Sequence, residues 1–148
     1  DSRALVVGAT DATKKLRFEV DGFTTGNTRV ATPPDEDFSI GFRNIPQNSQ
    51  SAAYELVLAD SGKHVLHPTA DNNPRTFTIP ANASVAFATG TAVTFVNQIN
   101  TVTIAITTDT LTLAGSGSTG SRTLAANGIA TALKVAATSW VINGTGLT

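Results

Sequence analysis

The stretch TLAANGIATALKVAATSWVIN, residues 123–143, decides the fold class, because a helix and β-strands compete for it. Its many alanines favour a helix. Its larger aliphatic residues instead recur at the period of two that is typical of a strand, and Gly128 interrupts any helix. The two sides of this alternation are Ile129, Thr131, Leu133 and Val135 against Ala130, Ala132 and Lys134. We therefore predict strands here.

Asn127-Gly128, which lies between two such alternating runs, is a strong signal for a hairpin. A two-residue type I′ turn needs positive φ at both central positions, which Asn and Gly tolerate best. Short apolar runs also recur about every ten residues from Ala52 onward, separated by turn residues. This spacing predicts an all-β fold in which residues 51–148 form a compact antiparallel sandwich or barrel.

The first 50 residues contain only short β-favouring pieces, ALVV at 4–7, KLRFEV at 15–20 and TRVAT at 28–32. In KLRFEV the residues Leu16, Phe18 and Val20 share one side of a strand. Strands this short bury too little apolar surface to be stable alone, so they need a partner surface. We expect residues 1–50 to be an extended attachment or intertwining segment that ends at the polar, proline-containing stretch 44–51.

Composition excludes several classes of partner and chemistry. The net charge is -1 and only 14% of the 148 residues are charged, so no field attracts nucleic acid or an anionic membrane surface. The absence of cysteine excludes disulfides, cysteine zinc sites and thiol catalysis. No apolar run approaches the roughly 18 residues that span a bilayer. We expect a soluble chain with neither a nucleic-acid partner nor membrane insertion.

The segment GSGSTG at 115–120 has the G-x-G-x-x-G spacing of a dinucleotide-binding turn. Such a turn requires a preceding strand, a following helix and an acidic residue about 20 positions later. Only the strand is predicted, and no Asp or Glu follows Asp109. We expect a flexible loop between two strands and no cofactor.

His64 and His67 are the only two histidines, with Asp60 and Asp71 nearby in sequence. Joint coordination of a metal ion is one interpretation, but a three-residue offset in a strand sends the two side chains to opposite faces. We favour two histidines on a polar surface. The chain also lacks the G-x-S-x-G motif of hydrolases, and no spacing supports a catalytic triad, so we expect no enzyme.

Trp140 alternates with Ile142, which favours packing in the core or between subunits over a sugar-stacking platform. Polar side chains that we expect to be exposed and able to contact a glycan are Arg122, Lys134, Asn97 and Gln98.

Two stretches resemble recurring segments of structural appendage proteins of tailed bacteriophages. The first is TDATKKLRFEVDGFTTGNTRVATPPDED at 10–37, with the marks Asp11, Thr13, Lys14, Phe18, Thr25, Gly26, Thr28, Arg29, Pro34 and Asp35. The second resembles a β-rich domain near the ends of such proteins, with the marks Asp60, Gly62, Lys63, TIPANASVAF, Gly90-Thr91, Ala130-Thr131, Lys134, Ala137-Thr138, Trp140 and Gly144.

The resemblance implies a homotrimeric protein of the virion surface, made in the bacterial host cytoplasm. Its N-terminal segment would attach to capsid, portal-proximal or tail proteins while the C-terminal domain projects. The chain has no coiled-coil heptads and no collagen-like repeat, so a small head-fibre, decoration or spike subunit fits better than a long tail fibre. The alternative is a tail-fibre receptor-binding module for a host-surface glycan.

Two residue sets follow from these hypotheses. For virion attachment or the trimer interface we predict Leu16, Phe18, Val20, Phe23 and Arg29. For surface-binding loops we predict Asn72, Asn73, Arg75, Ser118 and Arg122.

Overall fold

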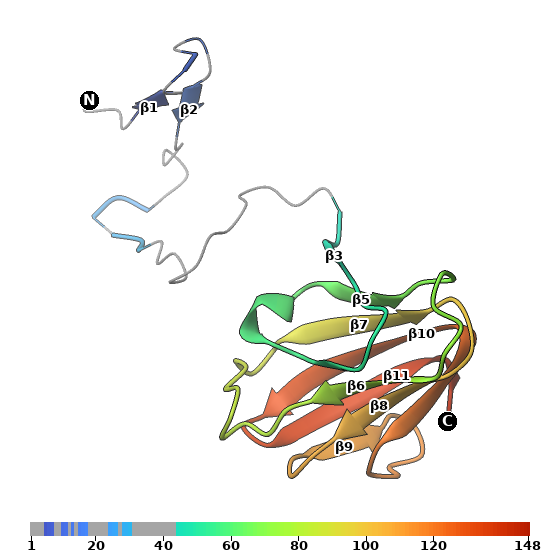
Figure 1. The fold of residues 1–148 in the computed structure, drawn as a ribbon. Helices are drawn as coiled ribbons and strands as arrows, with labels where there is room; N and C mark the ends of the chain where they lie inside the picture. The colour runs from blue at the N-terminus through green and yellow to red at the C-terminus, as the bar shows by residue number, and fades with distance from the viewer. Residues whose placement is uncertain are drawn as a thin grey trace. The chain divides into compact units, whose positions relative to one another are not determined.

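The computed structural model of the chain describes residues 5–7, 10–11, 13, 15–17, 24–26, 28–30 and 44–148. The chain divides into two compact units, Asp1–Ile40 and Gly41–Thr148 (Figure 1). The regular structure in the described ranges is β-strand apart from one short 3-10 helix, η1 (Leu58–Asp60), so the all-β prediction is confirmed. No helix in these ranges is long and apolar enough to cross a membrane.

The first unit contains β1 (Leu5–Val7) and β2 (Lys15–Arg17), which pair antiparallel. The second unit begins earlier than the sequence suggested. β3 (Gln47–Ser49) pairs in parallel with β5 (His64–His67), so residues that we expected in the N-terminal segment belong to the large sheet.

The second unit is built around one nine-stranded sheet, in which seven strands follow the order β3-β5-β7-β10-β8-β6-β4, β11 pairs with β10, and β9 pairs with β11. Its remaining strands are β4 (Tyr54–Glu55), β6 (Arg75–Ile79), β7 (Ala92–Asn97), β8 (Val102–Ile106), β9 (Thr110–Leu113), β10 (Arg122–Ala136) and β11 (Ser139–Leu147).

The expectation of a purely antiparallel sheet is wrong. β5 pairs in parallel with β3 and β7, β6 pairs in parallel with β4 and β8, and β9 pairs in parallel with β11. Consecutive strands from β3 to β8 fall in alternate halves of the sheet, so spatial neighbours are two strands apart in the chain and run in the same direction. β10 is antiparallel to β7, β8 and β11.

The predicted hairpin at Asn127-Gly128 is also wrong, although the prediction of strands over a helix is confirmed. Asn127 has φ 61°, but Gly128 does not have positive φ, so the type I′ turn does not form. β10 instead continues from Arg122 to Ala136, and its register against β11 shifts between Leu124 and Ile129. The irregularity lets one strand pair first with β8 and then with β7.

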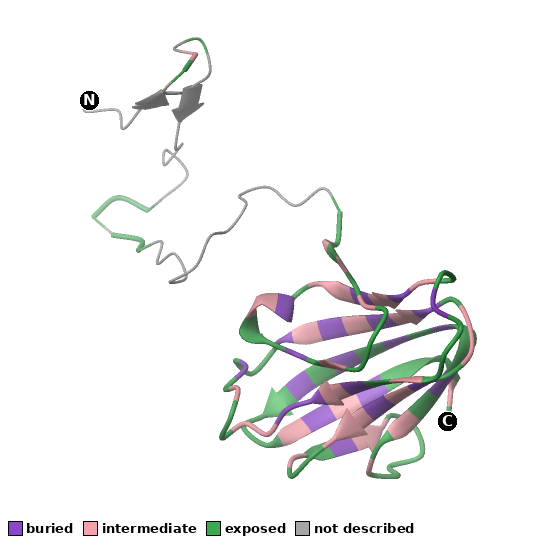
Figure 2. Cartoon of the chain, in the orientation of Figure 1, coloured by how far each residue is buried: buried purple, intermediate pink, exposed green. Residues whose placement is uncertain are grey.

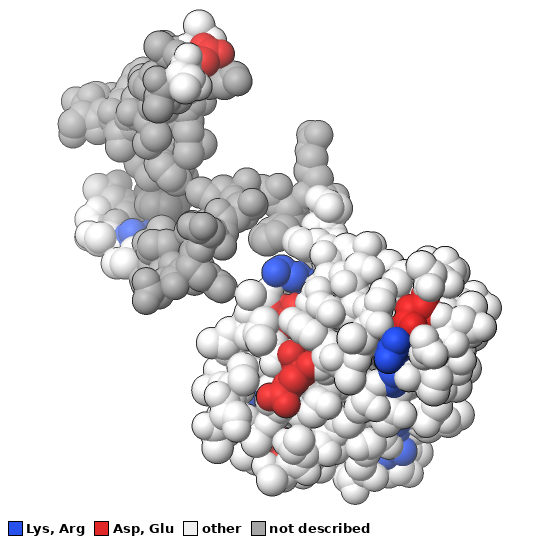
Figure 3. Space-filling model, in the orientation of Figure 1, with Lys and Arg blue, Asp and Glu red and all other residues white. Residues whose placement is uncertain are grey.

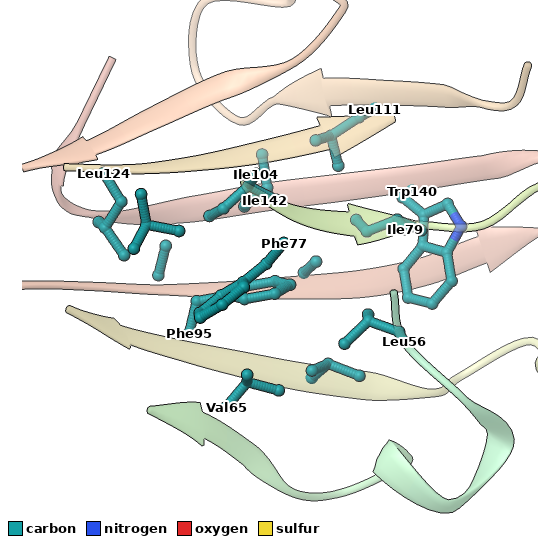
Figure 4. Packing of buried hydrophobic residues seen from close by; sticks show 14 of the residues in the cluster. Leu56, Val65, Phe77, Ile79, Phe95, Ile104, Leu111, Leu124, Trp140 and Ile142 are labelled. Atoms are coloured by element: carbon teal, nitrogen blue, oxygen red, sulfur yellow. The ribbon is translucent and has the colours of Figure 1, made fainter. Parts of the chain in front are cut away.

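The core lies between the two halves of the sheet, where side chains from both sides meet (Figure 4). Phe77 and Phe95 stack with ring centroids 6.5 Å apart, and Phe87 meets Trp140 edge-on at 5.6 Å. Trp140 is buried in the core, which is one of the two packing positions predicted for it. Ala130 of β10 pairs with Phe95 of β7, and both are buried.

Composition suggests that the larger aliphatic side chains of β10 face the core, but the structure buries the other side of the strand. The small Ala130 and Ala132 face the core together with Lys134, whereas the larger aliphatic residues of the strand face outward. Figure 2 shows the alternation as bands of buried and exposed residues along the strands. The outward aliphatic side chains are Ile129, Leu133 and Val135, with exposed fractions of 49%, 42% and 45%.

Candidate functional site

A buried polar cluster surrounds His67, whose side chain shares the inward face of β5 with Val65. The Nδ1 atom of His67 lies 2.8 Å from Oδ1 of Asn97, and Nε2 lies 3.2 Å from Oδ2 of Asp71. The amide Nδ2 of Asn97 donates to the carbonyl oxygens of Leu124 and Asn100, which fixes its Oδ1 as an acceptor. Both ring nitrogens therefore face oxygen acceptors, and neither is available to a metal ion or a substrate.

Asp71 holds the loop between β5 and β6 together. Its carboxylate accepts hydrogen bonds from Nε and Nη2 of Arg75 at 2.5 and 2.9 Å and from Nδ2 of Asn73 at 2.6 Å. These bonds, above all those from Arg75, hold the pKa of Asp71 well below its ordinary value of 3.8. They also raise the pKa of Arg75. Arg75 and Asn73, predicted as surface-binding residues, thus have a structural partner.

The two histidines lie on opposite faces of β5, as predicted. His64 is partly exposed, and its Nε2 lies 3.1 Å from Oε1 of Gln47. The prediction of a polar surface position is wrong for His67, because β5 turns that side toward the core. In the ranges that the structure describes, no group of three or more His, Cys, Asp or Glu side chains is placed to hold a metal ion.

Lys134 is buried, with 1% of its surface exposed. Its Nζ donates to Oδ1 of Asn82 at 2.6 Å and lies 5.5 Å from the centroid of the Trp140 ring. The cation–π contact and the hydrogen bond together replace part of the hydration that the ammonium group loses on burial.

The prediction that Lys134 and Asn97 are exposed glycan contacts is therefore wrong. The period of two in the sequence already indicated burial of both residues. Asn97 shares one side of its strand with Phe95 and Val93, and Lys134 shares one side of its strand with Ala132. Residue type suggested exposure, but position in the strand decided burial.

The remaining predicted loop residues lie in two separate places. Asn72 is exposed, and its carbonyl oxygen and Oδ1 accept from Nδ2 of Asn100 at 3.4 and 3.3 Å. Ser118 is exposed in the loop that joins β9 to β10, which confirms the prediction of a loop for residues 115–120. Arg122 is partly buried, and its Nε and Nη2 have no hydrogen-bond partner among the described residues. No hydrogen bond or ion pair between described side chains joins these two places.

The predicted attachment residues fall in the first unit. Leu16 lies in β2 opposite Val6, and Arg29 is exposed. Phe18, Val20 and Phe23 lie outside the described residues. The attachment role of this set stays a prediction.

Charged side chains are sparse on the face of the second unit that Figure 3 shows, and acidic and basic groups stand in a few small clusters on a mostly uncharged surface. A comparison with models of known protein families finds no match, and a comparison with curated proteins also finds none.

Proposed function

We propose that this chain is a structural subunit of a bacteriophage particle, a small trimeric head-fibre, decoration or spike protein. It attaches to capsid, portal-proximal or tail proteins through its N-terminal segment and projects a β-sandwich or barrel domain from the particle surface. The resemblance of residues 10–37 and of the C-terminal β unit to phage appendage proteins supports this function.

The observation that carries the proposal is the small size of the β1–β2 sheet. Each strand has three residues, and no other described strand pairs with them. An isolated two-stranded sheet is marginally stable at best in water, so a partner surface that extends or covers it would stabilise it. Val30, which is 82% exposed in the same unit, is an aliphatic side chain that such a partner would bury.

Localisation on intact particles tests this function. We expect antibody labelling in electron micrographs to place the chain on the virion surface, and light scattering to give the mass of three chains. Particles assembled with a chain that lacks residues 1–40 should carry no label, while the shortened chain keeps its β-rich circular dichroism spectrum. A full-length chain that is monomeric and absent from particles would exclude the proposal.

A second candidate function is recognition of a host-surface glycan. The exposed loop side chains of Asn72 and Ser118 favour it, because amide and hydroxyl groups exchange hydrogen bonds with sugar hydroxyls. Retention of the chain on a glycan array, lost in Asn72→Ala or Ser118→Ala and kept in Arg29→Gln, would support this role. Failure of the wild-type chain to bind any glycan or host cell would count against it.

A further inference from the structure

The outward side of β10 presents three large aliphatic side chains, Ile129, Leu133 and Val135, each more than two-fifths exposed. β10 is paired with β7 on one side and β11 on the other, so these residues lie on a sheet face and not at an open edge. Single exposed aliphatic residues are common on protein surfaces, but a contiguous apolar patch marks a site of interaction.

The strand register shows which residues surround this stripe. Three rows cross the sheet, Val96–Ile129–Thr145, Thr94–Thr131–Asn143 and Ala92–Leu133–Val141. We call these nine residues and Val135 the outer face. None of them is ionisable, and β5 extends the rows with Leu66 beside Val96 and His64 beside Thr94. The outer face is thus apolar or neutral throughout.

The hydroxyl groups of Thr94 and Thr131 and the Oδ1 atom of Asn143, all on the outer face, already have partners within the chain. The hydroxyl oxygens of Thr94 and Thr131 lie 2.9 Å apart and share a hydrogen bond. Oδ1 of Asn143 accepts from the backbone N–H of Gly144 at 2.8 Å. Covering the face would therefore not leave these hydroxyl and carbonyl groups without hydrogen bonds, which is the usual cost of burying polar atoms.

The outer face is not flat. A shallow hollow of about 330 Å³ lies between β10 and β11, lined by Ile129, Ala130, Thr131, Asn143, Gly144 and Thr145. Protruding aliphatic side chains and a hollow therefore occur side by side on one face. Around a threefold axis each copy must bring two different, complementary patches to its neighbours, and the protruding aliphatic side chains and the hollow supply such a pair.

The dimensions of the face suit the centre of a subunit interface. Three strands at about 4.8 Å spacing and about six residues at about 3.3 Å each give roughly 14 Å by 20 Å, or about 280 Å² in projection. A standard interface buries about 800 Å² on each partner, with an apolar centre and a polar rim. The outer face is large enough for that centre.

We propose that the outer face is the surface through which copies of this chain associate. The lack of charge argues for a second copy, because identical faces meet without like-charge repulsion and an acidic or basic partner would find no complementary charge. The inference rests on the proposed function only for the number of copies, which we take as three.

Charge substitutions in the full-length chain test this interface by light scattering and analytical ultracentrifugation. We expect Leu133→Lys and Ile129→Lys to raise the dissociation constant of the oligomer at least 100-fold and to give folded monomers. Leu58→Lys is the matched control, since Leu58 is 52% exposed on η1 outside the outer face. Circular dichroism and the unfolding temperature establish that each variant is folded.

Cysteine cross-linking gives an independent measurement if the lysine variants do not fold. The chain has no cysteine, so Thr131→Cys introduces a single thiol at the centre of the outer face. We expect a short bismaleimide to link two chains through Thr131→Cys, and no link through the exposed loop variant Ser118→Cys.

The outcomes separate this inference from the proposed function. An oligomer that survives both lysine substitutions in folded protein, or that shows no cross-link through Thr131→Cys, overturns the interface and leaves the virion role intact. A wild-type chain that is monomeric at every concentration overturns both the interface and the trimer. Labelling of particles tests the virion role separately.

Discussion

At the residue scale, two buried polar side chains of the second unit, His67 and Lys134, have specific partners. His67 is held between Asn97 and Asp71, while Lys134 is held by Asn82 and lies over Trp140. Each replaces water with a hydrogen bond inside the protein, which limits the cost of burial. These contacts fix local geometry, and they account for polar residues at inward positions of strands.

Substitution of Lys134 tests how its burial affects stability. We expect Lys134→Ala to lower the free energy of unfolding by about 2–4 kcal/mol, because it leaves a cavity beside Trp140. Lys134→Met should change it by within about 1 kcal/mol, since the volume is kept and the cost of burying a charge is removed. Urea denaturation measures both values. Equal losses for Met and Ala would show that the ammonium group itself stabilises the fold.

Asp71 gives the protein a pH-dependent contribution to stability. Its pKa in the folded state lies below the ordinary 3.8, so the unfolded chain binds the proton more readily. The contribution is therefore present above about pH 4 and is lost as the pH falls through 3.8 and below. We expect wild type to be more stable than Asp71→Asn at pH 6, and the difference to shrink at pH 2.5.

Urea midpoints at the two pH values measure this difference. Glu55→Gln, which removes an exposed carboxylate on β4, is the control and should not reproduce the pattern. A gap between wild type and Asp71→Asn that stays constant with pH would show that the carboxylate acts through its shape and not its charge.

At the element scale, β10 organises the second unit, because it pairs with β8, β7 and β11 in turn. The close contact of β10 with β11 depends on Gly144. An added Cβ at Gly144 would lie 2.2 Å from the carbonyl oxygen of Ile129 and 2.5 Å from Cα of Ala130. Both contacts are with backbone, so no side-chain rotation relieves them.

We expect Gly144→Ala to lower the free energy of unfolding by about 3 kcal/mol or more, since it overpacks the pairing of β10 and β11. Gly117→Ala is the comparison, because Gly117 has φ +73° with open space around its Cβ position. Its cost should be about 1–2 kcal/mol, from the left-handed backbone alone. Thermal denaturation ranks the two variants, and similar losses would contradict the predicted clash.

At the scale of the whole molecule, the hydrophobic core among the described residues belongs to the second unit. The buried hydrophobic cluster is drawn from residues 56–142, all within Gly41–Thr148. We therefore expect the fragment 41–148 to fold alone, with an unfolding temperature within a few degrees of the same transition in the full chain. Differential scanning calorimetry of fragment and full chain measures this. A fragment without a cooperative transition would show that the first unit contributes to the core.

The sequence alone predicted the all-β class, the loop at 115–120 and a packing role for Trp140 in the core or between subunits, because alternation and turn residues are local signals. The tertiary structure decided which strands pair with each other. Asn127-Gly128 carries a hairpin signal, yet β10 runs on because both of its halves have sheet partners to pair with.

Tertiary structure also decided which side of β10 faces inward. Alternation divides a strand into two sides but does not say which side is buried. Composition favoured burial of Ile129 and Leu133 over burial of Ala130 and Lys134, and the structure has the reverse. On the buried side, Ala130 pairs with Phe95 of β7 and Lys134 pairs with Trp140 of β11. The aliphatic side therefore lies on the surface. Contacts between residues far apart in the sequence decide this, and a local sequence pattern does not contain them.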